Sequence, residues 1–213
     1  RMNRRAELLL ALLLAFSGAS MAEAPGEKPL VVGATTALSG AFFTEMWGNN
    51  TSDIDVRILL HGYSPAVWTR QSLFAAEPTA IRDLTRGTAD NGNLVYVVTI
   101  QENLVYNDGT PITAADYVFS MLLHGAPVMG ELDGTQTHVE YVAGYEAFVS
   151  GESEVFSGLR LLGPYRYSVE IDAAYLPYFY ELGMLDFPPY PVHVIAPGCV
   201  VADDGKGAYI RNE

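Results

Sequence analysis

The stretch that most restricts the fold is Tyr106–Ser120, YNDGTPITAADYVFS, because it holds a turn and a helix start side by side. The Asp-Gly pair predicts a turn in which glycine takes a positive φ, and the proline after it fixes an extended approach to the helix. Thr113 is spaced to form a capping box with Asp116, ahead of an apolar helical run that Gly125 ends. Each special residue has a structural task, so we interpret this stretch as scaffold.

The other elements are predicted from hydrophobic periodicity and from the positions of glycine and proline. The strand over Asn93–Gln101 is apolar on both faces, which indicates that both of its faces are covered. The remaining predictions are a buried first strand at Pro29–Ala37, a helix with Ser52 as its N-cap and Gly62 as its stop, a helix within Val139–Val149, a hairpin of Leu159–Leu162 and Tyr165–Asp172, and an aromatic-rich helix over Ala173–Phe187.

The N-terminus is typical of a secretory leader. Arg4 and Arg5 precede an apolar run at Leu8–Phe16, and small residues follow it. The run is too short to cross a bilayer as a helix. We therefore predict a signal peptide over residues 1–22, cleaved after Ala22, and a mature chain of residues 23–213. The alternative is an amphipathic first helix of the folded domain.

The chain is acidic, with a formal net charge of −13, and loss of three arginines and one glutamate with the leader gives −15. Such a charge disfavours nucleic acid and anionic membrane surfaces as partners. Cys199 is the only cysteine, so no intrachain disulfide forms. It lies far from the leader, which disfavours a lipid anchor, and we interpret it as a structural thiol in preference to a nucleophile or ligand.

The motifs of common enzymes are missing: the sequence has no Gly-x-Gly-x-x-Gly, Walker A or His-Glu-x-x-His pattern. The segment GYSPA offers Ser64 as a nucleophile, but an alanine stands where the second glycine of a nucleophile elbow belongs. We interpret Ser64 as a turn residue. The histidines are dispersed, at His61, His124, His138 and His193, which predicts no metal site.

The segment LVYNDGTPITAADYVFS resembles the signature of the family 5 extracellular solute-binding proteins, the oligopeptide, dipeptide and nickel receptors of ABC importers. The order of the segments LSGAFF, VRILLHG, YVVTIQENLVY and GPYRYSVEIDAAYLPYFYELG is similar to that of the family, so the resemblance covers nearly all of residues 30–195. Gly40 stands where the family usually has proline, and Tyr106 replaces a common tryptophan.

The resemblance implies an α/β fold of the periplasmic-binding-protein-like (type II) class. Residues 23–213 would form its first lobe, with a mixed β-sheet and flanking helices, and the family continues into a second lobe beyond this length. The loop of Phe43, Thr44, Glu45, Met46 and Trp47 would face the ligand cleft, or alternatively would pack on its own lobe. A chain that ends at Glu213 is then expected to bind ligand weakly or not at all.

The function that the resemblance implies is the capture of a peptide or similar small solute in the periplasm or outside the cell. Its partners would be the transmembrane subunits of an ABC permease, and the protein would be a monomer without cofactor, metal or nucleic acid. Two alternatives remain from the residues alone, a secreted serine hydrolase that uses Ser64 and a surface interaction domain without catalysis.

Overall fold

The computed structural model describes residues 31–40, 50–132, 134 and 139–213. Thr36–Glu213 form one compact unit, and Arg1–Thr35 are a separate one. The predicted leader over residues 1–22 and the predicted ligand loop Phe43–Trp47 lie outside the described residues. Within the described part of the chain, no helix is both long enough and apolar enough to cross a membrane.

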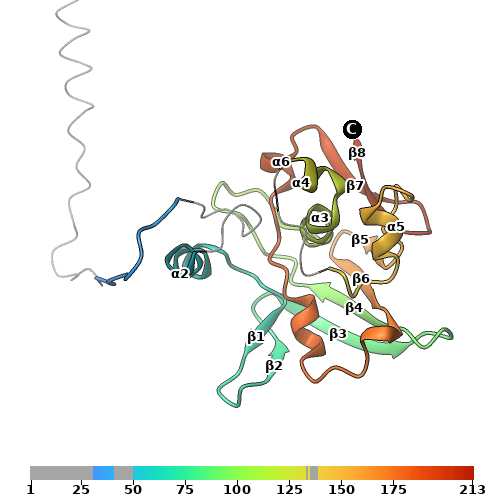
Figure 1. Cartoon of the computed structure of the whole chain (residues 1–213), viewed down its shortest axis with the longest axis horizontal. Coiled ribbons are helices and arrows are strands. Elements are labelled where there is room, and N and C mark those ends of the chain that lie inside the picture. Colours follow the sequence, from blue (N-terminus) through green and yellow to red (C-terminus); the bar gives the residue numbers. More distant parts are fainter. Residues whose placement is uncertain (1–30, 41–49, 133, 135–138) are drawn as a thin grey trace, which may run out of the picture. The chain divides into compact units, whose positions relative to one another are not determined.

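The main sheet has four strands in the order β3-β4-β6-β5, and all of its pairs are antiparallel (Figure 1). Its strands are β3 (Ile81–Thr88), β4 (Leu94–Ile100), β5 (Leu159–Gly163) and β6 (Arg166–Ile171). The predicted hairpin of residues 159–172 is confirmed. The expected mixed sheet is corrected for the described residues, because short turns join β3 to β4 and β5 to β6 and such turns connect antiparallel strands.

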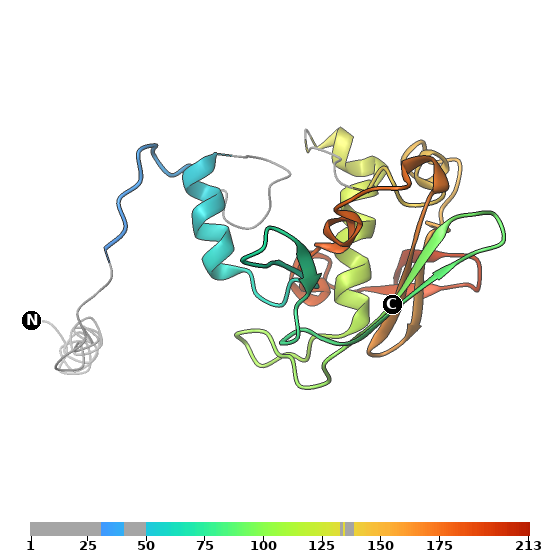
Figure 2. The ribbon, with the colours of Figure 1, turned by 90° about the horizontal axis from the view of Figure 1, so that it is seen from below.

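Helix α3 (Ala114–Gly125) forms the centre of the hydrophobic core and packs against strands of the main sheet, running alongside it in Figure 2. The ring of Tyr117 on α3 stacks on that of Tyr167 on β6 at a centroid distance of 5.7 Å. On β4 one face is buried and the other is half-buried, so the prediction of a strand covered on both sides is confirmed in part.

The predicted capping box at the start of α3 is confirmed. The carboxylate of Asp116 accepts hydrogen bonds from the amide of Thr113 at 2.8 Å and from its hydroxyl at 3.0 Å. The helix ends at Gly125 as expected. Gly109 has φ 86°, the left-handed conformation that the Asp-Gly turn predicted.

Helix α2 (Thr51–Leu60) is confirmed, but its N-cap is Asn50 and not Ser52. The Asn50 side chain accepts a hydrogen bond from the Ser52 amide at 2.8 Å, which places Ser52 inside the first turn. Asp53 is fully buried on this helix and accepts a hydrogen bond from the Ser39 amide at 3.0 Å. Hydrogen bonding from Ser39 lowers the pKa of Asp53.

The remaining elements are short and surround this core. They are β1 (Ala66–Trp68) paired with β2 (Phe74–Ala76), β7 (Cys199–Asp203) paired with β8 (Ala208–Asn212), the helices α4 (Pro127–Glu131), α5 (Tyr145–Val149) and α6 (Val192–Ile195), and the 3₁₀ helices η2 (Ala173–Tyr175) and η3 (Glu181–Leu185).

Three predictions of secondary structure are wrong in whole or in part. The described residues 31–37 of the predicted first strand are not a strand, and they have no strand partner among the described residues. The predicted helix of Val139–Val149 is helical only over α5, because Gly144 takes the left-handed conformation just before it. Residues 173–187 form two separate 3₁₀ helices, since Pro177 between them lacks an amide hydrogen and obstructs a continuous helix.

Candidate functional site

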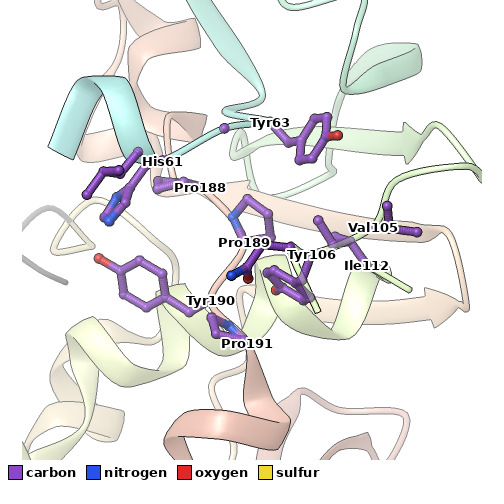
Figure 3. Close-up of a pocket in the computed structure, with 12 residues that line it drawn as sticks. His61, Tyr63, Val105, Tyr106, Ile112, Pro188, Pro189, Tyr190 and Pro191 are labelled. Atoms are coloured by element: carbon purple, nitrogen blue, oxygen red, sulfur yellow. The ribbon is translucent and has the colours of Figure 1, made fainter. Parts of the chain in front are cut away.

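A cavity of about 700 Å³ lies where the chain leaves α2, passes the Asp-Gly turn and returns along a proline-rich run (Figure 3). Three segments line it, and their residues are Leu60, His61, Gly62 and Tyr63 after α2, Val105, Tyr106, Asn107 and Ile112 around the turn, and Pro188, Pro189, Tyr190 and Pro191 in the return run. We call this space the proline cavity.

The wall after α2 is held by an unusual backbone conformation. Tyr63 has a backbone φ of 63°, a value that residues other than glycine rarely adopt. Its carbonyl accepts a hydrogen bond from the hydroxyl of the buried Tyr117 at 2.7 Å. His61 lies beside Tyr190 in an edge contact, with ring centroids 6.3 Å apart. Figure 3 shows these two rings at one side of the cavity.

The proline-rich wall is fastened to the same helix start that the sequence predicted. The Asp116 backbone carbonyl accepts a hydrogen bond from the Tyr190 amide at 3.2 Å, and the Asp116 side chain accepts one from the Val192 amide at 3.4 Å. Beyond this run, His193 Nε2 and Asp108 Oδ2 lie 2.9 Å apart. Asp116 therefore joins the start of α3 to the proline run.

Asp108 remains ionised down to strongly acidic pH. The pKa of its carboxyl is lowered to about 2, first because the Thr110 amide donates a hydrogen bond to it at 2.9 Å, and then because of the contact with His193. At neutral pH the Asp108 carboxylate thus holds the turn on one side and α6 on the other.

The lining of the cavity suits apolar and aromatic groups. Prolines and tyrosines present flat hydrocarbon surfaces, and prolines cannot donate backbone hydrogen bonds to a ligand. The Tyr106 hydroxyl is buried without a hydrogen-bond partner among the described residues, and burial raises the pKa of this phenol far above its usual value. Tyr106 therefore stays protonated at every physiological pH, and its hydroxyl lies beneath the surface of the cavity.

The geometry around Ser64 disfavours the hydrolase alternative. A nucleophile elbow places its serine between a strand and the helix that follows. Here Ser64 follows helix α2 and precedes strand β1, which is the reverse order. The serine is best explained as a turn residue.

The described lining of the cavity lies in segments that the sequence did not predict as ligand-binding. Phe43, Thr44, Glu45, Met46 and Trp47 lie outside the described residues. The lining residues around the Asp-Gly turn belong to the stretch that we interpreted as scaffold, and those at Pro188–Pro191 belong to a proline-rich run to which we had given no function. Among the described residues, no group of three or more His, Cys, Asp or Glu side chains is arranged to hold a metal ion. Asp204 and Gly205 lie in the turn of the β7–β8 hairpin, where the Asp203 and Asp204 side chains accept hydrogen bonds from the amides of Gly205 and Lys206.

No protein-family model matches the chain, and no curated protein matches it either. Solved structures do match. Haemophilus influenzae OppA, in complex with RPPGFSPFR, has a TM-score of 0.55 at 13% identity over 76% of this chain and 33% of its own.

Two further structures have similar values. OppA of Listeria monocytogenes bound to peptide has a TM-score of 0.52 at 17% identity, over 66% of this chain and 27% of its own. The periplasmic murein tripeptide-binding protein MppA in its unliganded open form has a TM-score of 0.53 at 15% identity, over 73% of this chain and 32% of its own.

The chain has the fold of part of a family 5 solute-binding protein. It spans about a third of the length of these structures or less. The resemblance to these proteins that the sequence predicted is thereby confirmed at the level of fold.

Proposed function

We propose that residues 23–213 form part of the extracytoplasmic substrate-binding component of an ABC importer, which captures peptides or similar small solutes. The observation that carries this proposal is the fold, which is shared with proteins solved with bound peptides. The charged, apolar and small-residue segments of the N-terminus support a location in the periplasm or outside the cell.

In this proposal the proline cavity receives an apolar part of the ligand. Its tyrosine and proline surfaces gain from burying hydrocarbon of the ligand. The loop Phe43–Trp47 remains the proposed source of further contacts. Capture would proceed by a shift between open and closed arrangements of two lobes, without bond chemistry, before delivery to the permease transmembrane subunits.

The first prediction concerns peptide binding in the proline cavity. Val105 lines the cavity and is 48% exposed, so Val105→Glu places a charge at an apolar wall without disturbing the core. Because one part of a larger protein supplies few contacts, we expect a Kd on the order of 1 mM for uncharged, apolar peptides. We expect Val105→Glu to weaken this binding roughly fivefold to tenfold, because contact of the glutamate carboxylate with an apolar ligand removes water from the charge at a cost in free energy.

The measurement is a titration followed by amide chemical shifts, with uncharged peptide pools. Val128→Glu is the matched control, since Val128 is 47% exposed and is not part of the cavity lining. Shift changes should concentrate on the lining residues and become smaller in Val105→Glu alone. If no pool moves these resonances, or if both substitutions weaken binding equally, the proposal is wrong for this cavity.

A further inference from the structure

A second cavity, of about 660 Å³, lies between the β1–β2 hairpin and η3, and it shares no lining residue with the proline cavity. Its lining consists of Trp68, Phe74, Glu140, Tyr141, Tyr175, Tyr178, Tyr180, Gly183, Met184, Asp186 and Phe187. Most of these side chains are aromatic, two are carboxylates and none is basic. We call this space the aromatic cavity.

The aromatic wall is built by direct ring contacts. The ring centroid of Trp68 lies 4.1 Å from that of Phe74 and 5.3 Å from that of Tyr180. Glycine is required behind this wall, because a Cβ atom on Gly183 would lie 2.7 Å from Phe74 Cε2. Trp68 is nevertheless 55% exposed and Tyr178 is 47% exposed, so part of the aromatic surface still faces solvent.

The basic group next to this wall is already paired. Arg86 Nε on β3 donates to Glu181 Oε1 on η3 at 2.8 Å, and the Tyr96 hydroxyl donates to the same oxygen at 2.6 Å. The ion pair cancels the charge of Arg86 locally. It also fixes η3, and with it Gly183 and Tyr180, against the sheet.

Two residues of the lining, Glu140 and Asp186, carry carboxylates near Tyr141. Glu140 and Asp186 both lie close enough to the Tyr141 phenol to raise its pKa, in addition to the larger effect of burial. The Tyr141 hydroxyl donates to the Met184 carbonyl at 2.6 Å, which keeps the ring in the lining. An aromatic surface beside two carboxylates is attractive to a cation, and the net charge of −13 acts in the same direction.

We propose that the aromatic cavity binds an organic cation of the guanidinium or alkylammonium class. The aromatic faces would stack on the ligand, and Glu140 would neutralise its charge. A small metal ion is a poor fit, because it gains nothing from hydrocarbon walls and because the described residues contain no suitable cluster of ligands. The inference stands on this cavity alone and does not depend on the proposed transport function.

The test uses N-acetyl-arginine amide and N-acetyl-citrulline amide, which have nearly the same shape and differ by the charge of the side chain. Amide chemical shifts of the lining residues report the binding of each probe. We expect the arginine probe to bind roughly fivefold to tenfold more tightly than the citrulline probe, with the difference falling as salt is added.

Two variants locate the binding. Glu140→Gln is expected to lower the affinity for the arginine probe roughly threefold to fivefold, whereas Glu152→Gln, which removes the same charge from an exposed residue outside the lining, should have little effect. Tyr178→Leu should weaken both probes, since both stack on the ring.

The proposal is overturned by any of three results: equal affinity for the two probes, equal losses in Glu140→Gln and Glu152→Gln, or no saturation by the arginine probe up to about 10 mM. This test and the peptide titration can fail separately, because Val105 lines the proline cavity and does not line the aromatic cavity.

Discussion

Asp116 shows how one buried carboxylate serves two parts of the molecule. It is only 6% exposed, and it accepts hydrogen bonds from the amide and hydroxyl of Thr113 and from the Val192 amide. The bonds to Thr113 begin α3, and the bond to Val192 holds the wall of the proline cavity. Loss of this side chain therefore leaves buried donors without an acceptor, which costs more than loss of an exposed carboxylate.

At the residue scale we expect Asp116→Ala to lower the free energy of unfolding by about 2 kcal/mol, since it removes a helix cap and a charged acceptor together. Urea denaturation followed by circular dichroism measures this loss. Asp55→Ala is the control, because Asp55 is an exposed residue of α2, and its effect should stay within about 0.5 kcal/mol. Equal effects of the two substitutions would contradict the role given to Asp116.

The sequence predicted only the local half of this residue's role. A capping box depends on residues three positions apart, so Thr113 and Asp116 suffice to predict it. The bond to Val192 joins residues 76 positions apart, and no spacing rule indicates it. The N-cap of α2 was misplaced for a related reason, since Asn50 and Ser52 are both good caps and only the geometry chooses between them.

At the element scale, η3 shows how the tertiary structure decides what a segment becomes. The sequence of residues 173–187 is apolar and aromatic, which favoured a helix, yet Pro177 and Gly183 both disfavour one. The chain instead forms η2 and η3, and Glu181 joins η3 to β3 and β4 through Arg86 and Tyr96. The β5–β6 hairpin was predicted correctly, because its second strand alternates between apolar and polar residues and its turn is short.

The bonds that fix η3 differ in strength. Arg86 is 55% exposed along its side chain, so its ion pair with Glu181 is screened by water and contributes about 0.5 kcal/mol. Tyr96 is 2% exposed and donates to a charged acceptor, which contributes about 1.5 kcal/mol. We therefore expect Tyr96→Phe to reduce the free energy of unfolding more than Arg86→Gln does.

Thermal unfolding of the two variants in parallel measures this order. The reverse order would mean that the exposed ion pair dominates the attachment of η3. Burial and the bond to Glu181 together raise the pKa of Tyr96 to about 12, so both variants should be compared at neutral pH, where this phenol is fully protonated.

At the scale of the whole unit, the stable core and α2 are built differently. The core brings α3 together with β4 and β6 through fully buried side chains such as Val98, Tyr117 and Tyr167. Helix α2 instead buries Asp53 and Arg57 and leaves its apolar residues Ile58, Leu59 and Leu60 exposed.

Neither cavity could be located from the sequence. The aromatic cavity assembles residues from positions 68 to 187, and the proline cavity assembles residues from 60 to 191. The periodicity of a segment predicts which of its faces is buried, but not which distant segment lies opposite. The family signature was still informative, because its turn and cap define one wall of the proline cavity.

The difference between α2 and the core predicts a difference in local stability, because burial of apolar surface is the main source of protection against opening. We expect the amides of α3, β4 and β6 to exchange hydrogen only through global unfolding, and those of α2 to exchange through local opening with a free energy several kcal/mol smaller. Native-state hydrogen exchange in rising urea separates the two, since local opening depends only weakly on urea. If the α2 amides matched those of α3 in protection and in urea dependence, the hydrogen bonds of Asp53 and Tyr63 would have to hold α2 as firmly as apolar packing holds the core.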